Sequence, residues 1–188
     1  MGQWVFGVGN KVIDFNSKTN NTKVVAELNE FSSVVSIIQD FEEFIWIATN
    51  NSGILKYHSI TGSKESITRN NGLSYNQIRY LFHDREGQVW IATSAGLDQY
   101  LGRSFLLFDR KAGLIDNLIW DFTRFHEQIL LATPSGLHLM DINKEGQFVL
   151  LKTFDLNGEE PRKIVTGQGS QQIFVITDKH NLWTGNFG

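Results

Sequence analysis

A short apolar strand recurs five times along the chain at nearly constant spacing. Its copies begin at Trp4, Trp46, Trp90, Leu130 and Phe174, which lie 42, 44, 40 and 44 residues apart. A period of about 40–50 residues, with several short strands in each repeat, is typical of propeller blades. The spacing therefore predicts an all-β chain built from four-stranded antiparallel sheets that follow one another along the sequence.

Residues 71–100 show the repeating unit most clearly. Residues 78–83 read as an extended strand, residues 84–87 as a polar turn that ends in glycine, and residues 88–93 as a second, mostly apolar strand. A third strand begins at residues 97–100, and residues 105–108 make a fourth. The same register predicts first strands at 34–40, 118–123 and 163–166, and outer strands at 22–26 and 148–152. No helix signal interrupts the series.

The second strand of each unit is apolar on both of its faces. Residues 45–48, 89–92 and 129–132 are continuous apolar runs rather than alternating ones. Such runs are expected when a strand is covered on both sides, as in stacked sheets. Ala48, Ala92 and Ala132 recur in one column, where a small side chain lets neighbouring sheets approach closely.

The ends of the chain predict an incomplete β-propeller arc of about four blade-equivalents. The sequence opens at a second strand and stops after a third strand at residues 182–184. We expect one domain over residues 1–188, cut from a longer propeller protein, with blades at 1–32 (partial), 33–76, 77–117, 118–161 and 162–188 (partial). Exposed apolar sheet faces at both ends predict self-association, or docking with the remaining blades of a longer chain.

Composition excludes several classes of function. The chain has no cysteine, which excludes disulfides and thiolate chemistry, and its five histidines lack paired metal spacing. A net charge of −3 without a Lys/Arg run argues against nucleic-acid binding. No apolar run reaches the roughly 18 residues of a membrane span, so we expect no membrane contact, no metal and no cofactor. The first residues lack the basic region and apolar core of a signal peptide.

The pattern N-G-L-S-x-N-x-I-x-x-L-x-x-D-x-x-G-x-x-W-I-A-T-x-x-G-L-x-x-Y, read over residues 71–100, resembles the two-component regulator propeller repeat. The resemblance is close in this block and extends in weaker form over most of the chain. The D-x-x-G turn changes at residues 40–43, 124–127 and 167–170, and Leu130 replaces the tryptophan of the pattern. These changes predict divergent blades of the same propeller.

In that family the repeats form the extracytoplasmic sensor region of hybrid two-component histidine kinases of gut Bacteroidetes. The resemblance implies a periplasmic, non-catalytic sensor that responds to glycan fragments. It also implies a kinase, a β-sandwich domain and a membrane span, whose motifs do not occur in this sequence. Two rival functions stay open: a propeller scaffold that binds a protein, and a polysaccharide lyase or glycosidase, for which the sequence offers no converging acid–base pair.

Residues that break the repeat near an exposed end of an inner strand are the best candidates for ligand binding. Arg79 and Trp120 stand out because their column holds Val35 in the preceding repeat. Aromatic rings contact the apolar faces of sugars, and amide or guanidinium groups bind hydroxyls and carboxylates. The candidate set for an oligosaccharide is Tyr75, Asn76, Arg79, Asn117 and Trp120. Two structural roles compete: Trp120 packing between blades, and Arg79 pairing with Asp121 or Glu86.

Two further motifs have simpler interpretations. Asp40 and Asp84 share one column and read as turn formers, and two carboxylates on separate hairpins do not make a glycosidase site. The segment Gly7-Val8-Gly9-Asn10-Lys11 is predicted to be a hairpin turn and not a phosphate loop, because no helix follows it.

Overall fold

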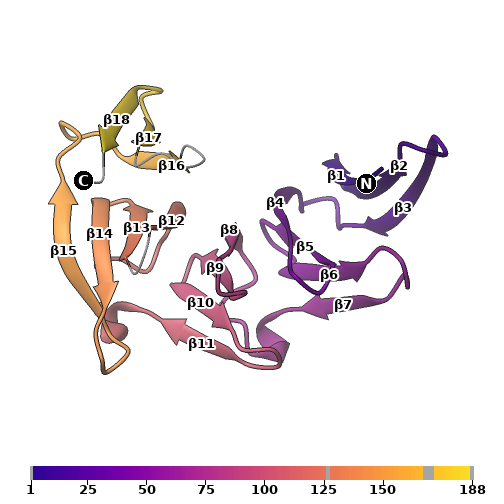
Figure 1. The fold of residues 1–188 in the computed structure, drawn as a ribbon, viewed down its shortest axis with the longest axis horizontal. Helices are drawn as coiled ribbons and strands as arrows, with labels where there is room; N and C mark the ends of the chain where they lie inside the picture. Colours follow the sequence, from indigo (N-terminus) through magenta and orange to yellow (C-terminus); the bar gives the residue numbers. More distant parts are fainter. Residues whose placement is uncertain (1, 126–127, 167–171, 187–188) are drawn as a thin grey trace.

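The computed structural model describes residues 2–125, 128–166 and 172–186. Within these ranges the chain forms five antiparallel sheets of three, four, four, four and three strands, in that order along the sequence. The sheets follow one another around an open arc, with the first and last sheets at its two ends (Figure 1). The prediction of an all-β, incomplete propeller arc is confirmed.

The strand bounds are as follows. The first sheet holds β1 (Gln3–Val8), β2 (Lys11–Asn16) and β3 (Asn21–Glu27), and the second holds β4 (Val34–Gln39), β5 (Phe44–Thr49), β6 (Ile54–His58) and β7 (Lys64–Ile67). The third sheet holds β8 (Ile78–His83), β9 (Val89–Thr93), β10 (Leu97–Tyr100) and β11 (Phe105–Phe108). The fourth holds β12 (Asp121–Phe125), β13 (Gln128–Thr133), β14 (Gly136–Ile142) and β15 (Phe148–Phe154), and the fifth holds β16 (Pro161–Thr166), β17 (Gln172–Thr177) and β18 (Leu182–Asn186).

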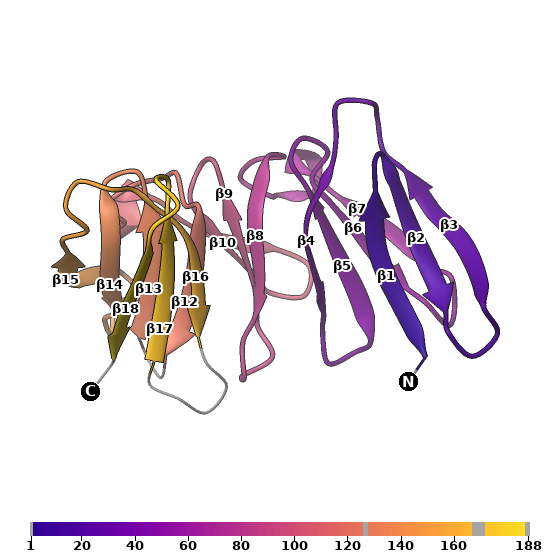
Figure 2. The same ribbon diagram turned by 90° about the horizontal axis from the view of Figure 1, so that it is seen from above.

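The first strands of successive sheets line the concave side of the arc. Strands β4, β8, β12 and β16 contact one another in that order, and the outer strands β7, β11 and β15 lie on the convex side (Figure 1). Figure 2 shows β1–β3 at one end and the fourth and fifth sheets overlapping at the other. We call the concave edge formed by β4, β8, β12 and β16 the hub.

The hydrophobic core is divided into layers between neighbouring sheets. Trp46 and Trp90, which are 0% and 2% exposed, belong to two successive layers. Ala48, Ala92 and Ala132 are fully buried in these layers, as expected for sheets that approach closely. Trp46, Trp90 and Leu130 therefore pack sheet against sheet, as the predicted column requires. In the first sheet the column is one residue off, because Val5 faces the second sheet and Trp4 is exposed.

The Asp40 and Asp84 carboxylates close the hairpin between the first and second strands of their sheets. In the third sheet one oxygen of Asp84 accepts from the Gln88 backbone N–H at 2.7 Å, and the other accepts from the Trp90 indole N–H at 2.8 Å. Asp40 makes the same bond to Trp46 at 2.7 Å. Both are turn formers, as predicted. The altered turns at His126–Glu127 and at residues 167–170 lie outside the described residues.

Three sequence-based predictions of secondary structure need adjustment. The strand expected from Leu118 begins at Asp121, because the chain bulges at Trp120 before pairing with β13. Strand β16 begins at Pro161, two residues before the strand expected from residue 163, in the position where a strand tolerates proline. Two short 3-10 turns, η1 (Arg69–Asn71) and η2 (Arg110–Ala112), were not expected; Thr68 and Asp109 cap their first residues. The segment around Gly9 is a β1–β2 hairpin, as predicted.

Candidate functional site at the hub

Each inner strand carries an irregularity near its beginning that directs one side chain toward the hub. The pairing register shifts across Val35 in β4, across Arg79 in β8 and across Arg162 in β16. In the fourth sheet the Trp120 backbone N–H donates to the Ala132 carbonyl at 2.9 Å, while Asp121 also pairs with Ala132. Two residues thus oppose one, which is the pattern of a β-bulge, and bulges redirect side chains.

The bulge positions of three successive sheets meet around one indole ring. The guanidinium carbon of Arg79 lies 4.8 Å from the Trp120 ring centroid, and that of Arg162 lies 4.2 Å from it. The two arginines come from the sheets on either side of the sheet that carries Trp120 (Figure 1). Both distances fall within the range of cation–π attraction. We call Arg79, Trp120 and Arg162 the hub triad.

Two polar atoms of the hub triad are buried without a partner. Nε of Arg79 and Nε1 of Trp120 are inaccessible to solvent, and no acceptor in the described part of the chain bonds to either. Burial, followed by the charge of Arg162, lowers the pKa of Arg79. Buried donors are normally satisfied, so two unpaired ones side by side mark an unusual site.

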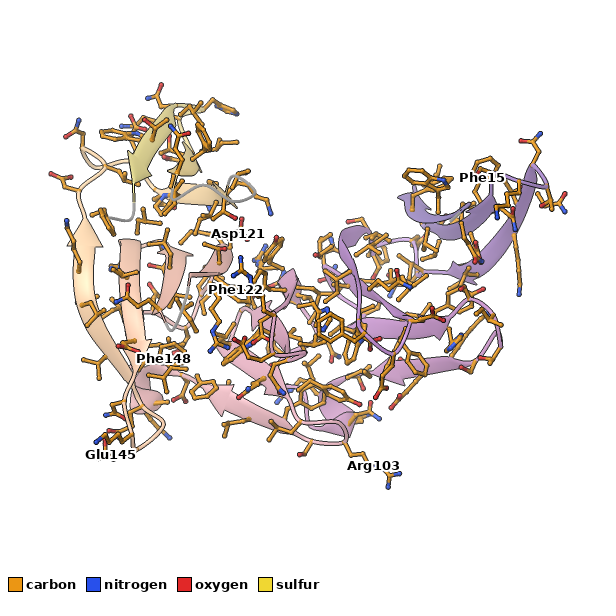
Figure 3. All side chains as sticks on the ribbon, in the orientation of Figure 1. Phe15, Arg103, Asp121, Phe122, Glu145 and Phe148 are labelled. Carbon is orange, nitrogen blue, oxygen red and sulfur yellow. The ribbon has the colours of Figure 1, made fainter. Side chains whose placement is uncertain are left out.

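The next position along each inner strand adds a second group of charges. Lys163 Nζ lies 3.0 Å from an Asp121 carboxylate oxygen and 3.8 Å from the centroid of the Tyr80 ring. The same Asp121 oxygen accepts from the Ile164 backbone N–H at 2.8 Å, which ties β12 to β16. Burial raises the pKa of Asp121, and the Lys163 ammonium opposes that rise. Asp121 lies on the concave side of the arc (Figure 3).

The other candidate residues have separate surroundings. Tyr75 is 42% exposed, and the guanidinium carbon of Arg69 lies 5.8 Å from its ring centroid. The side-chain oxygens of Asn76 and Asn117 accept from the backbone N–H groups of Arg69 and Arg110, each at 2.8 Å. These amides therefore fix η1 and η2 in the same way in two repeats. The structure brings Arg79 and Trp120 together and gives Asn76 and Asn117 a shared role in the turns.

The pairing of Arg79 with Asp121 or Glu86, considered from the sequence, is replaced by other pairs. Asp121 binds Lys163, and Glu86 lies 3.3 Å from Arg124. Sequence reasoning did not single out Arg162, whose guanidinium also lies 2.8 Å from a Glu160 carboxylate oxygen. The signal was available: Arg162 occupies the column of Val35, Arg79 and Trp120 once the bulge is counted.

Another buried carboxylate, that of Asp98, lies away from the hub triad, in β10. Asp98 is 0% exposed; one of its oxygens accepts from the Ser74 hydroxyl at 2.6 Å and from the Ser74 backbone N–H at 3.2 Å. Its other oxygen is buried without a partner among the described residues. Burial raises the pKa of Asp98 to about 6. His138 holds the same position in the next sheet, bonded to Thr153 at 3.0 Å.

The described ranges contain no group of three His, Asp or Glu side chains that could hold a metal ion. They also contain no helix of the length and apolar character needed to cross a membrane.

Residues 72–95, which cover the turn after η1, strand β8 and strand β9, match the model of the two component regulator propeller. This segment is a two-component regulator propeller repeat. The propeller repeat includes Arg79 and the Asp84–Trp90 pair. No curated protein matches the chain by sequence.

Solved structures share the fold of the propeller repeats at low identity. A domain described as the extracellular domain of hybrid two component system BT3049 from B. thetaiotaomicron is 20% identical, with a TM-score of 0.74 over 98% of this chain and 26% of that one. The β-propeller domain of Cps50 (Swd1) from Myceliophteria thermophila is 9% identical, with a TM-score of 0.71 over 100% of this chain and 62% of that one. Virginiamycin B lyase from Staphylococcus aureus is 13% identical, with a TM-score of 0.66 over 95% of this chain and 64% of that one. The chain spans about a quarter of the length of the first structure.

Proposed function

We propose that the chain is a non-catalytic part of the ligand-sensing β-propeller of a hybrid two-component sensor, that it lies outside the cytoplasm, and that it responds to a glycan. The observation that carries the proposal is the two-component regulator propeller repeat at residues 72–95. The fold shared with an extracellular domain described as part of such a system supports it. Ligand binding would then shift the placement of blades, because a ligand favours the arrangement that it binds best.

The surroundings of Asp121 and Asp84 support a non-catalytic role for these two carboxylates. Asp121 is held by Lys163 and the Ile164 backbone, and Asp84 by Trp90 and Arg124. Each carboxylate thus serves as an acceptor in its own sheet or between sheets. A glycosidase needs two carboxyl groups that face one cleft at about 5–10 Å, one of them free to give up a proton.

The exposed face of the first sheet supports docking of further blades of a longer chain. Trp4, Phe6 and Val8 are 65%, 40% and 57% exposed on β1, whereas the equivalent strands β5 and β9 are almost wholly buried. These three alternate positions lie on one face of the strand. A sheet packed on this face would bury it, just as the second sheet buries the equivalent residues of β9.

Calorimetric titration of the 188-residue chain with a panel of neutral and acidic oligosaccharides tests the sensor proposal. We expect at least one class to bind and to raise the melting temperature, because a ligand that binds only the folded state stabilises it. Capture of a defined protein partner with no response to any saccharide would instead support the scaffold. Release of products from a polysaccharide, abolished by one carboxylate substitution, would establish an enzyme.

A further inference from the structure

We infer that the hub triad binds an oxyanion, the carboxylate or sulfate group of an acidic saccharide, through Arg79, Trp120 and Arg162. The inference rests on the proposed function and specifies the class of its ligand. It is drawn from the hydrogen-bonding capacity of the triad, its charge and its place at the hub.

The hub triad contains two donor atoms that lack an acceptor among the described residues. Nε of Arg79 and Nε1 of Trp120 are donors only, and both are buried without an acceptor in the described part of the chain. A buried donor without an acceptor is costly, so a site that contains two of them favours a group that accepts several bonds. Carboxylate and sulfate oxygens only accept, which matches this requirement.

The charges around the hub triad favour an anionic ligand. Arg162 is paired with Glu160 at 2.8 Å, and Lys163 is paired with Asp121 at 3.0 Å. Arg79 adds a positive charge that no carboxylate of the described residues neutralises at ion-pair distance. The group of charges at the hub therefore carries an excess positive charge in a chain whose net charge is −3. A planar guanidinium is also the side chain best suited to bind a carboxylate or sulfate through two parallel bonds.

The Trp120 indole ring positions the two arginines of the hub triad. The Trp120 ring already contacts the guanidinium groups of Arg79 and Arg162. It therefore holds the two arginines in place, and its N–H is a further donor at the site. The site thus binds the acidic group of the ligand. A neutral saccharide of the same size lacks this carboxylate or sulfate.

Calorimetric titration at low salt tests the inference with four probes: an oligogalacturonate, a sulfated oligosaccharide, a neutral oligosaccharide of equal length and inorganic sulfate. We expect one or both acidic saccharides to bind, the neutral one to bind at least about tenfold more weakly, and the affinity to fall as salt is added. Inorganic sulfate should compete with the acidic saccharide. The two acidic probes decide between the carboxylate and the sulfate.

Four variants locate the site. Arg79→Gln and Arg162→Gln should each weaken binding of the acidic saccharide about tenfold or more, and Trp120→Phe, which keeps a ring but removes the N–H, should weaken it several-fold. Arg103→Gln is the matched control, because it removes the same charge from an exposed residue on the convex side of the arc (Figure 3). Circular dichroism and melting curves verify that each variant is folded.

The outcomes separate the two proposals. Equal binding of neutral and acidic saccharides, or acidic binding unchanged in Arg79→Gln, would overturn the oxyanion site and leave the glycan sensor standing. No binding of any saccharide would overturn both. Loss of affinity in Arg103→Gln as large as in Arg79→Gln would show that only overall charge matters, and would also overturn the site.

Discussion

The indole N–H of Trp90 donates a hydrogen bond of 2.8 Å to the Asp84 carboxylate, on the first turn of the same hairpin. The oxygen that accepts this bond also accepts one from Arg124 of the next sheet, at 2.8 Å. One carboxylate thus connects the turn, the core tryptophan and the neighbouring blade. In the preceding sheet Asp40 makes the bond to Trp46.

Replacement of these two carboxylates should have unequal effects. Asp84→Ala leaves the Trp90 and Arg124 donors without their shared acceptor at a residue that is 3% exposed, so we expect a loss of about 3 kcal/mol in unfolding free energy. Asp40→Ala at the more exposed turn should cost about 1–2 kcal/mol. Urea unfolding followed by tryptophan fluorescence measures both. Equal losses would mean that the contact with Arg124 contributes nothing.

Two tryptophans on equivalent strands allow a second comparison. Trp90 is 2% exposed between sheets, whereas Trp4, on the face of β1 turned away from the second sheet, is 65% exposed. We expect Trp90→Ala to lower the unfolding free energy by about 3–5 kcal/mol through the cavity that it leaves, and Trp4→Ala to lower it by less than about 1 kcal/mol. Calorimetric unfolding measures both. A large loss in Trp4→Ala would show that the face of β1 is covered in solution.

The fold could be predicted from the sequence because packing of a blade requires an apolar strand on both faces. That requirement repeats Trp46, Trp90 and Leu130 at nearly equal spacing, and the sheets form where the column places them. The start of β12 could not be placed, because a bulge adds one residue without a compositional signal. The turns η1 and η2 were missed although Thr68 and Asp109, both good capping residues, precede them.

The candidate site was predictable only in part, for a related reason. Arg79 and Trp120 break the repeat and meet at the hub, as their shared column suggested. Arg162 was missed because its strand, which begins at Pro161, was expected to begin at Lys163. Asn76 and Asn117 recur at matching positions, and their side chains fix the preceding turn in both repeats. Repetition itself was the sign of their structural role.

Asp98 should make stability depend on pH. Burial raises its pKa from 3.8 to about 6, so between these values the folded chain holds a proton that the unfolded chain releases. The unfolding free energy should therefore fall as pH rises from about 4 to about 6, by up to about 3 kcal/mol, and stay lowered above that range. The unfolding free energy of the Asp98→Asn variant should not fall in this way between about pH 4 and about pH 6. Urea unfolding of both proteins at several pH values measures the difference, and parallel pH curves would contradict the assignment.

The link between inner strands differs in strength along the hub. Asp121, 1% exposed at its side chain, accepts from the Ile164 backbone N–H at 2.8 Å and pairs with Lys163, whereas Ser36 accepts from the Leu81 backbone N–H at 3.2 Å. Asp121→Ala should cost about 3 kcal/mol, since it leaves a buried N–H and an ammonium without their acceptor. Ser36→Ala should cost about 1 kcal/mol. The Ile164 amide should exchange more slowly than the Leu81 amide, and slower exchange at Leu81 would contradict this order.

Self-association should depend on the exposed face of β1. Trp4 and Val8 alternate on that face at 65% and 57% exposure, and a contiguous apolar surface of this kind favours contact with another sheet. We expect the 188-residue chain to form concentration-dependent oligomers, and Trp4→Lys to shift them toward monomer by placing a charge in the contact. Sedimentation velocity measures the distribution. Leu101→Lys is the control, because Leu101 is 53% exposed in the β10–β11 turn. If Leu101→Lys dissociates the oligomers as fully as Trp4→Lys, the contact does not use the β1 face.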